Sequence, residues 1–261
     1  MRGGASSCLR QVVVDAADPR GLAAWWASAL QWRSVAAHDE EAEIAPPEGL
    51  PGLPLVFVRV RDPKTGPNRL HLDLDSDSPA AQRGTVEFLL HAGARRVDVG
   101  QGSAPWVVLA DPEGNEFCVL DARPEYEGTG AVAAVVVQAH DPRRLARFWS
   151  LASGWDVVRD DRRAAALRCG RSGPYLEFVH SPAQRTGKNR WHLDVAPSPV
   201  PGAREGTGQH AVVTTLLDAG ARRRDVGQGR RPWVVLADPE GNEFCVLAEP
   251  RPDPAGGGAP D

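Results

Sequence analysis

A sixteen-residue segment that occurs twice limits what this chain can fold into. Residues 105–120 and residues 232–247 both read PWVVLADPEGNEFCVL. Upstream, NRLHLDL at 68–74 matches NRWHLDV at 189–195. Matches in this order identify a duplicated unit. We predict two copies of one domain, at residues 7–122 and 131–249. A linker at 123–130 joins them, and a Pro/Gly-rich tail at 250–261 is expected to be disordered.

Each copy is predicted to contain the same short series of elements twice. In the first copy an apolar run follows the N-terminus, and Asp18-Pro19 then offers a cap and a first-turn proline for a helix. Alternating and helical apolar spacing predicts the remaining elements. The first module of this copy is predicted to have a strand at 12–14, a helix from 18 and strands that end at 60. The second module is predicted to have a strand at 70–74, a helix at 81–91 and strands at 106–110 and 116–120.

Bulk composition excludes several classes of protein. The formal net charge is −4, which argues against a nucleic-acid surface. No apolar run approaches 18 residues, so we expect no membrane span, and the N-terminus lacks the core of a signal peptide. The four cysteines form no CxxC motif. We therefore expect a cytoplasmic protein in a reducing setting.

The repeated motifs resemble a known superfamily. A paired β-α-β-β-β unit, a DP-initiated helix bearing Trp, and a terminal DPEGN strand are similar to the vicinal oxygen chelate (VOC) superfamily. That superfamily includes glyoxalase I, extradiol dioxygenases and bleomycin-binding proteins. The TGxNRxHLD and DPEGNEFCV motifs resemble its glyoxalase-like subgroup. The resemblance implies an α+β fold of tandem glyoxalase-like domains, with four βαβββ modules forming two cupped half-barrel sheets, as a monomer or homodimer.

The resemblance also assigns four metal-ligand positions to each copy. In metal-using members these positions carry His or Gln, Glu, His and Glu. Neither copy completes the set, because Val56 and Ala134 cannot bind a metal. A divalent ion (Zn, Ni, Fe or Mn) is thus implied by the family, but with incomplete ligands. The positions are Gln11, Val56, His71 and Cys118 in the first copy, and Ala134, Glu177, His192 and Cys245 in the second.

Two His–Asp pairs are the best candidates for catalysis. His71 with Asp73, and His192 with Asp194, are spaced i, i+2 on predicted strands, which places each pair on one face. A carboxylate beside a histidine favours a raised histidine pKa and general acid–base work. Glu177 is expected to join His192 and Asp194. The alternative is a pair that only satisfies a buried cup floor.

Two further residue types are candidates for ligand binding. Trp106 and Trp233 begin predicted cup strands and either stack on a flat ligand or belong to the core. Arg69 and Arg190 precede the His strands and either clamp an anion or form a salt bridge with the Asp of the DPEGN turn.

Two functions from different classes follow. The first is a lyase- or isomerase-type enzyme that acts on a small, partly hydrophobic molecule in a cup. The alternative is a non-catalytic protein that sequesters an antibiotic or aromatic ligand, as in antibiotic resistance. An extradiol dioxygenase is less well supported, because no predicted cup supplies two His and a Glu.

Overall fold

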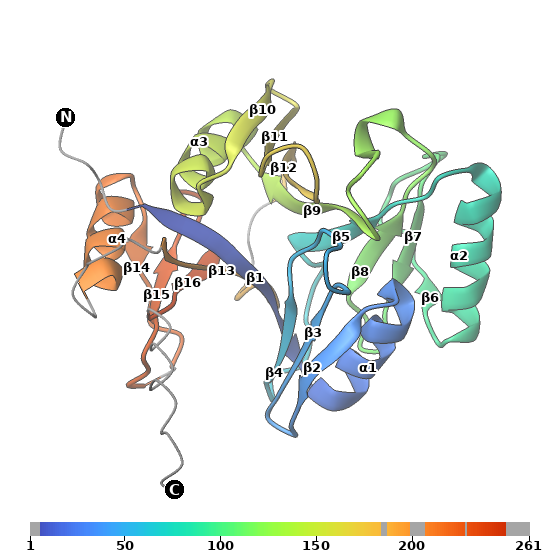
Figure 1. The fold of residues 1–261 in the computed structure, drawn as a ribbon, viewed down its shortest axis with the longest axis horizontal. Coiled ribbons are helices and arrows are strands. Elements are labelled where there is room, and N and C mark those ends of the chain that lie inside the picture. The colour runs from blue at the N-terminus through green and yellow to red at the C-terminus, as the bar shows by residue number, and fades with distance from the viewer. Residues whose placement is uncertain (1–5, 184–186, 199–206, 228, 249–261) are drawn as a thin grey trace, which may run out of the picture.

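The computed structural model describes residues 6–183, 187–198, 207–227 and 229–248. The predicted four βαβββ modules are all present (Figure 1). The predicted disordered tail lies outside the described residues. The first copy contains β1 (Ser7–Ala16), α1 (Pro19–Leu30), β2 (Arg33–Ala37), β3 (Glu41–Ala45), β4 (Leu55–Arg59), β5 (Leu70–Leu74), α2 (Pro79–His91), β6 (Arg95–Arg96), β7 (Val107–Ala110) and β8 (Glu116–Val119).

The second copy follows a short 3₁₀ helix, η1 (Pro124–Tyr126), in the linker. Its elements repeat those of the first copy. They are β9 (Val132–Ala139), α3 (Pro142–Ser153), β10 (Asp156–Asp160), β11 (Ala164–Arg168), β12 (Tyr175–His180), β13 (Trp191–Pro197), α4 (Thr207–Asp218), β14 (Arg222–Arg223), β15 (Val234–Ala237) and β16 (Glu243–Val246).

The strands form two eight-stranded sheets, and each sheet takes one module from each copy. Sheet A has the order β14-β15-β16-β13-β1-β4-β3-β2, and sheet B has the order β10-β11-β12-β9-β5-β8-β7-β6. The joining strands are antiparallel, β1 with β13 and β5 with β9. The four ligand positions assigned to each copy are therefore divided between the two sheets, and grouping them by copy was wrong. Because the copies carry equivalent strands, each first strand can pair equally well with the other copy's module.

Helix starts follow the predicted capping chemistry. Asp18 caps α1 by accepting a hydrogen bond from the Gly21 N–H, and Pro19 occupies the first turn. Asp141 caps α3 in the same way. Helix α2 begins at Pro79, two residues before its predicted start, because Ser78 caps it. Its predicted end at His91 is confirmed.

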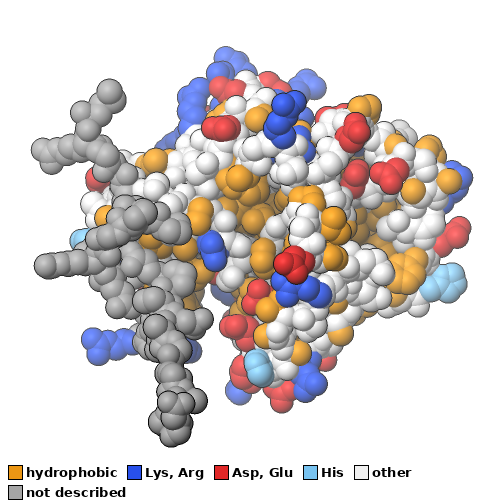
Figure 2. Space-filling view, in the orientation of Figure 1, with side chains coloured by type: hydrophobic (Ala, Val, Ile, Leu, Met, Phe, Trp, Pro, Cys, Tyr) orange, Lys and Arg blue, Asp and Glu red, His pale blue; other side chains and the backbone are white. Residues whose placement is uncertain are grey.

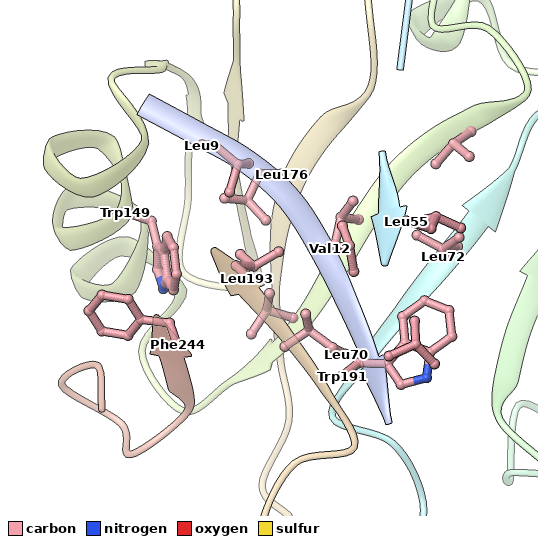
Figure 3. Close-up of a cluster of buried hydrophobic side chains, with 14 of the residues drawn as sticks. Leu9, Val12, Leu55, Leu70, Leu72, Trp149, Leu176, Trp191, Leu193 and Phe244 are labelled. Atoms are coloured by element: carbon pink, nitrogen blue, oxygen red, sulfur yellow. The ribbon is translucent and has the colours of Figure 1, made fainter. Parts of the chain in front are cut away.

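The hydrophobic core lies on the face of each sheet that meets the helices and the other sheet, which we call the inner face. Figure 3 shows apolar side chains of β1, β4, β5, β12 and β13 gathered there. The rings of Trp26 and Phe117 lie 5.0 Å apart at their centroids, and Trp26 also contacts Trp191 of the other copy. Side chains alternate along a strand, so the intervening residues lie on the opposite, outer face. On the face of the molecule that Figure 2 shows, charged side chains lie mainly around the periphery.

Candidate functional site

Because each sheet combines one module from each copy, the sheets determine which of the predicted site residues lie together. Gln11 of β1 is paired directly with Asp194 of β13 on sheet A. On sheet B, Asp73 of β5 is paired with Ala134 of β9. Glu177 lies on β12 in sheet B, so its expected grouping with His192 and Asp194 was wrong. Each outer face instead combines the first-half positions of one copy with the His–Asp pair of the other.

The outer face of sheet A carries a compact polar cluster. His192 and Asp194 project from β13, and Cys245 of β16 is the strand neighbour of Asp194. Nε2 of His192 lies 3.4 Å from Oδ1 of Asp194 and 3.7 Å from Sγ of Cys245. Gln11 donates a hydrogen bond from Nε2 to Oδ2 of Asp194 at 2.9 Å. Oδ1 of Asp194 is buried and has no hydrogen-bond partner within the part of the chain that the structure describes.

Burial dominates the electrostatics of this cluster. It raises the pKa of the Asp194 carboxyl to about 7, although hydrogen bonds from Gln11 and Cys245 act in the opposite direction. It lowers the pKa of His192 to about 3, and the positive charge of Lys188 adds to the effect. Burial also raises the pKa of the Cys245 thiol. The expectation of a raised pKa was therefore wrong for His192, because desolvation outweighs its carboxylate neighbour.

Sheet B carries the same cluster with different surroundings. Nε2 of His71 lies 3.4 Å from Oδ1 of Asp73, and the latter atom is again buried without a hydrogen-bond partner. Cys118 completes the triple, and burial raises the pKa of its thiol. Glu177 lies on the same face and forms an ion pair with Arg159 at 3.2 Å. Burial raises the pKa of the Glu177 carboxyl.

The linker covers the outer face of sheet B. Tyr126 of η1 is 4% exposed and donates its hydroxyl to Oε1 of Glu177 at 3.2 Å. Its ring also packs edge-to-face on Tyr175, with the ring centroids 5.7 Å apart. Tyr126 and Tyr175 are the only two tyrosines of the sequence. Tyr126 forms a buried cluster with Val108, Cys118, Leu120 and Ala133.

A second residue missed by sequence reasoning lies on sheet A. Glu43 of β3 is the strand partner of Val56, so both lie on the outer face. The equivalent pair on sheet B is Ala166 and Glu177. Each sheet thus carries one carboxylate in this pair, but on opposite strands. Val56 lacks the carboxylate expected at its position, and Glu43 supplies one beside it. Only the register between β3 and β4 shows this.

The predicted ligand-binding tryptophans lie just before β7 and β15, each beside an arginine. The Arg123 guanidinium lies 5.6 Å from the ring centroid of Trp106, and Arg231 lies at the same distance from Trp233. Cation–π contacts of this kind stabilise a ring on one face. Trp106 packs against the buried cluster that contains Cys118 on sheet B, and Trp233 immediately precedes β15 of sheet A.

The two predicted arginines connect the copies. Arg69 donates to the main-chain oxygen of Gln138 at 2.7 Å, and Arg190 donates to that of Asp15 at 2.6 Å. Each also pairs with the Glu of the DPEGN turn in the other copy, so the expected Asp partner was wrong. Both line a polar cleft of about 520 Å³ between the two NR segments. An anion-binding role in that cleft stays a prediction.

These strands and motifs place the chain in a family. It belongs to the glyoxalase-like domain family, which matches residues 11–120 and again residues 134–247. Glyoxalase I from Zea mays is similar in structure, with a TM-score of 0.61 at 14% identity, over 93% of this chain and 92% of that one. A Bacillus subtilis protein proposed to be a dioxygenase gives 0.60 at 13%, over 95% and 87%. At these identities the likeness concerns the fold alone.

Two further observations do not concern the site itself. No protein of curated function matches the sequence. Within the described residues, no helix is long and apolar enough to cross a membrane.

The donor set fits the metal that the family implies, although only His192 and Cys245 occupy family positions and Asp194 does not. His192, Asp194 and Cys245 place their ligand atoms within 4.8 Å of one another. Tetrahedral zinc with ordinary bond lengths requires about 3.4 Å between N and O ligands and about 3.5 Å between N and S. The observed 3.4 Å and 3.7 Å approach those edges. The neutral histidine and the unpartnered carboxylate oxygen also suit a cation.

Proposed function

We propose that the chain is an enzyme of the lyase or isomerase type that acts on a small, partly apolar molecule at the outer face of sheet A. The observation that carries the proposal is Oδ1 of Asp194, which is buried, has no hydrogen-bond partner among the described residues and lies 3.4 Å from Nε2 of His192. Leaving such a group unsatisfied costs about 1–3 kcal/mol. Polar atoms in this state concentrate at functional sites.

Three side chains would hold a divalent metal at this face. His192, Asp194 and Cys245 supply N, O and S donors, for which zinc is the best match among Zn, Ni, Fe and Mn. Such an ion supplies a Lewis acid that polarises a substrate oxygen. Three protein donors leave a fourth position for the ligand. Gln11 fixes the orientation of Asp194 through its 2.9 Å hydrogen bond.

Glu43 is the residue that would act as the general acid or base. It faces Val56 across the strand pair, and no ion pair or hydrogen bond engages its carboxyl within the described part of the chain. Partial burial, and then the neighbouring charge of Glu41, raise its pKa, while the charge of Arg33 acts in the opposite direction. A carboxyl group of this kind is a candidate for general acid–base catalysis. On sheet B the corresponding carboxylate, Glu177, is already bound to Tyr126 and Arg159. Sheet A is therefore the better candidate for turnover.

A non-catalytic binder is the second candidate. It is favoured by the apolar residues at two of the family's ligand positions, Val56 and Ala134. A binder would release an aromatic or antibiotic ligand unchanged, whereas an enzyme would convert it.

Metal content of the full-length protein tests the proposal. After zinc loading and desalting, we expect His192→Ala and Cys245→Ser to lose one equivalent of metal relative to the unmodified chain. His71→Ala reports on sheet B, and Cys169→Ser, which removes an exposed free cysteine, is the matched control. Cobalt loading should give a thiolate-to-metal charge-transfer band that Cys245→Ser weakens.

The opposite results are equally clear. Unchanged metal content and an unchanged cobalt spectrum in folded His192→Ala and Cys245→Ser would exclude the metal centre on sheet A. Circular dichroism confirms that each variant is folded.

A further inference from the structure

We infer that the outer face of sheet A binds a phenol, meaning an aromatic ring that carries a hydroxyl group, in the place that Tyr126 takes on sheet B. The inference deepens the proposed function, since it rests on sheet A as the working face and names the substrate class. It starts from a segment of the chain already seated on the equivalent surface.

Tyr126 occupies sheet B as a ligand would. The linker carries it onto the outer face, where its side chain is 4% exposed. The ring packs with Val108, Cys118 and Leu120, and the hydroxyl donates to Glu177 at 3.2 Å. Sheet B therefore has an apolar wall for a ring and a carboxylate for a phenolic hydroxyl, and the chain's own tyrosine satisfies both.

Sheet A repeats the wall that receives the ring. Val235, Cys245 and Leu247 stand at the places of Val108, Cys118 and Leu120, because the two sixteen-residue segments are identical. Strand pairing repeats as well, since Val235 faces Cys245 just as Val108 faces Cys118.

Sheet A also repeats the carboxylate, on the neighbouring strand. Glu43 and Val56 form the pair equivalent to Ala166 and Glu177. Arg159, which pairs with Glu177, faces Ala166, whereas Ala36 faces Glu43. An alanine thus stands beside Glu43 where Arg159 stands beside Glu177, and Arg33 acts on Glu43 through its charge. A phenolic hydroxyl is a suitable donor for such a carboxylate.

The described part of the chain places no tyrosine on the outer face of sheet A. The only tyrosines are Tyr126 and Tyr175, and both lie at sheet B. Residues 249–261, which follow sheet A as the linker follows sheet B, include no aromatic residue. One wall residue differs, because Arg10 stands at the bulge position of Ala133. A phenol with an acidic substituent is therefore also compatible with sheet A.

Binding of p-cresol, which has the structure of the tyrosine side chain, tests the inference. Titration calorimetry on the full chain, with and without zinc, should show one site per chain. Toluene, which lacks the hydroxyl, should bind at least tenfold more weakly. 4-Hydroxyphenylacetate should bind at least as well as p-cresol, and better than phenylacetate.

Variants locate the site. Glu43→Ala, which introduces the residue found at position 166, should weaken p-cresol binding at least tenfold. The matched control Glu48→Ala removes an exposed carboxylate of the same copy that lies outside β3 and should leave affinity within about twofold. Truncation after Ala248 reports whether the chain's own tail competes, and unchanged affinity is expected.

Several outcomes would overturn the inference. Failure of p-cresol to bind either form, equal binding of toluene, or full affinity in Glu43→Ala would each exclude a phenol at sheet A. A large gain in affinity after truncation would identify the tail as the occupant instead. The metal assay is independent. Metal uptake without p-cresol binding removes only the substrate class, and p-cresol binding without metal uptake removes only the metal centre.

Discussion

The indole N–H of Trp26 donates a hydrogen bond to Oδ2 of Asp111 at 3.1 Å, and Trp149 makes the same bond to Asp238. Each bond joins the helix of a copy's first module to the DPEGN turn of its second. The carboxylates are buried and also accept bonds from the turn's own Asn115 and Asn242. The two modules of one copy are thus tied on the inner side, although their strands belong to different sheets.

This tie predicts a large stability loss on substitution. Asp111→Ala leaves the indole N–H of Trp26 and the amide groups of the turn without their acceptor in a buried place, so we expect a loss of about 3 kcal/mol in the free energy of unfolding. Asp77→Ala, at an exposed site, should change it by less than about 0.5 kcal/mol. Urea denaturation measures both. A change under about 1 kcal/mol for Asp111→Ala would contradict the role given to this turn.

Arg69 should matter for the contact between copies. Arg69→Lys keeps the charge but loses the planar group that reaches Gln138, Ala183 and Asn242. We expect a loss of about 2 kcal/mol, measured by thermal denaturation. Arg20→Lys is the control, because its ion pair with Asp39 is exposed and worth about 0–1 kcal/mol. Equal effects of the two substitutions would show that the bonds of Arg69 contribute nothing special.

Glu177 should make stability depend on pH. Its folded-state pKa is raised mainly by burial, so its stabilising contribution is complete below the unfolded pKa and is lost as pH rises through the folded one. Glu177→Gln does not titrate, and should therefore gain stability relative to the unmodified chain as pH rises above the unfolded-state pKa of a glutamate, about 4. The exposed Glu48→Gln provides the matched slope. Parallel stability–pH curves for Glu177→Gln and the unmodified chain would refute the expectation.

Removing Tyr126 should open sheet B. Tyr126→Ala deletes a buried ring, which we expect to cost about 3–5 kcal/mol. Added p-cresol should restore part of the lost melting temperature and raise the binding stoichiometry by one per chain. Tyr126→Phe keeps the ring and should gain no such site. Absence of rescue in Tyr126→Ala would mean that the linker does not fill a ligand-shaped space.

The sequence predicted the modules because local chemistry determines them. Asp18-Pro19 starts a helix, and DPEGN makes a turn wherever it occurs. It did not predict which modules join, because both copies offer equivalent strands to one another. Glu43 and Tyr126 were also missed, each for a reason of its own. The first depends on the register between strands, and the second on where a short linker comes to lie.

The site residues were identified by type, but their grouping depended on tertiary structure. His192, Asp194 and Cys245 were each named from the sequence, and so was Gln11. Their electrostatic state could not be read in the same way, because the low pKa of His192 arises from burial that only packing creates.

The strand exchange between copies also has a genetic consequence. Each outer face takes half of its residues from one repeat and half from the other. Selection on either site therefore acts on both repeats at once. A damaging substitution in one repeat spoils one half of a face whose other half lies more than a hundred codons away. The repeats must therefore diverge in compatible steps, as Glu43 and Glu177 have done on opposite strands of matching pairs.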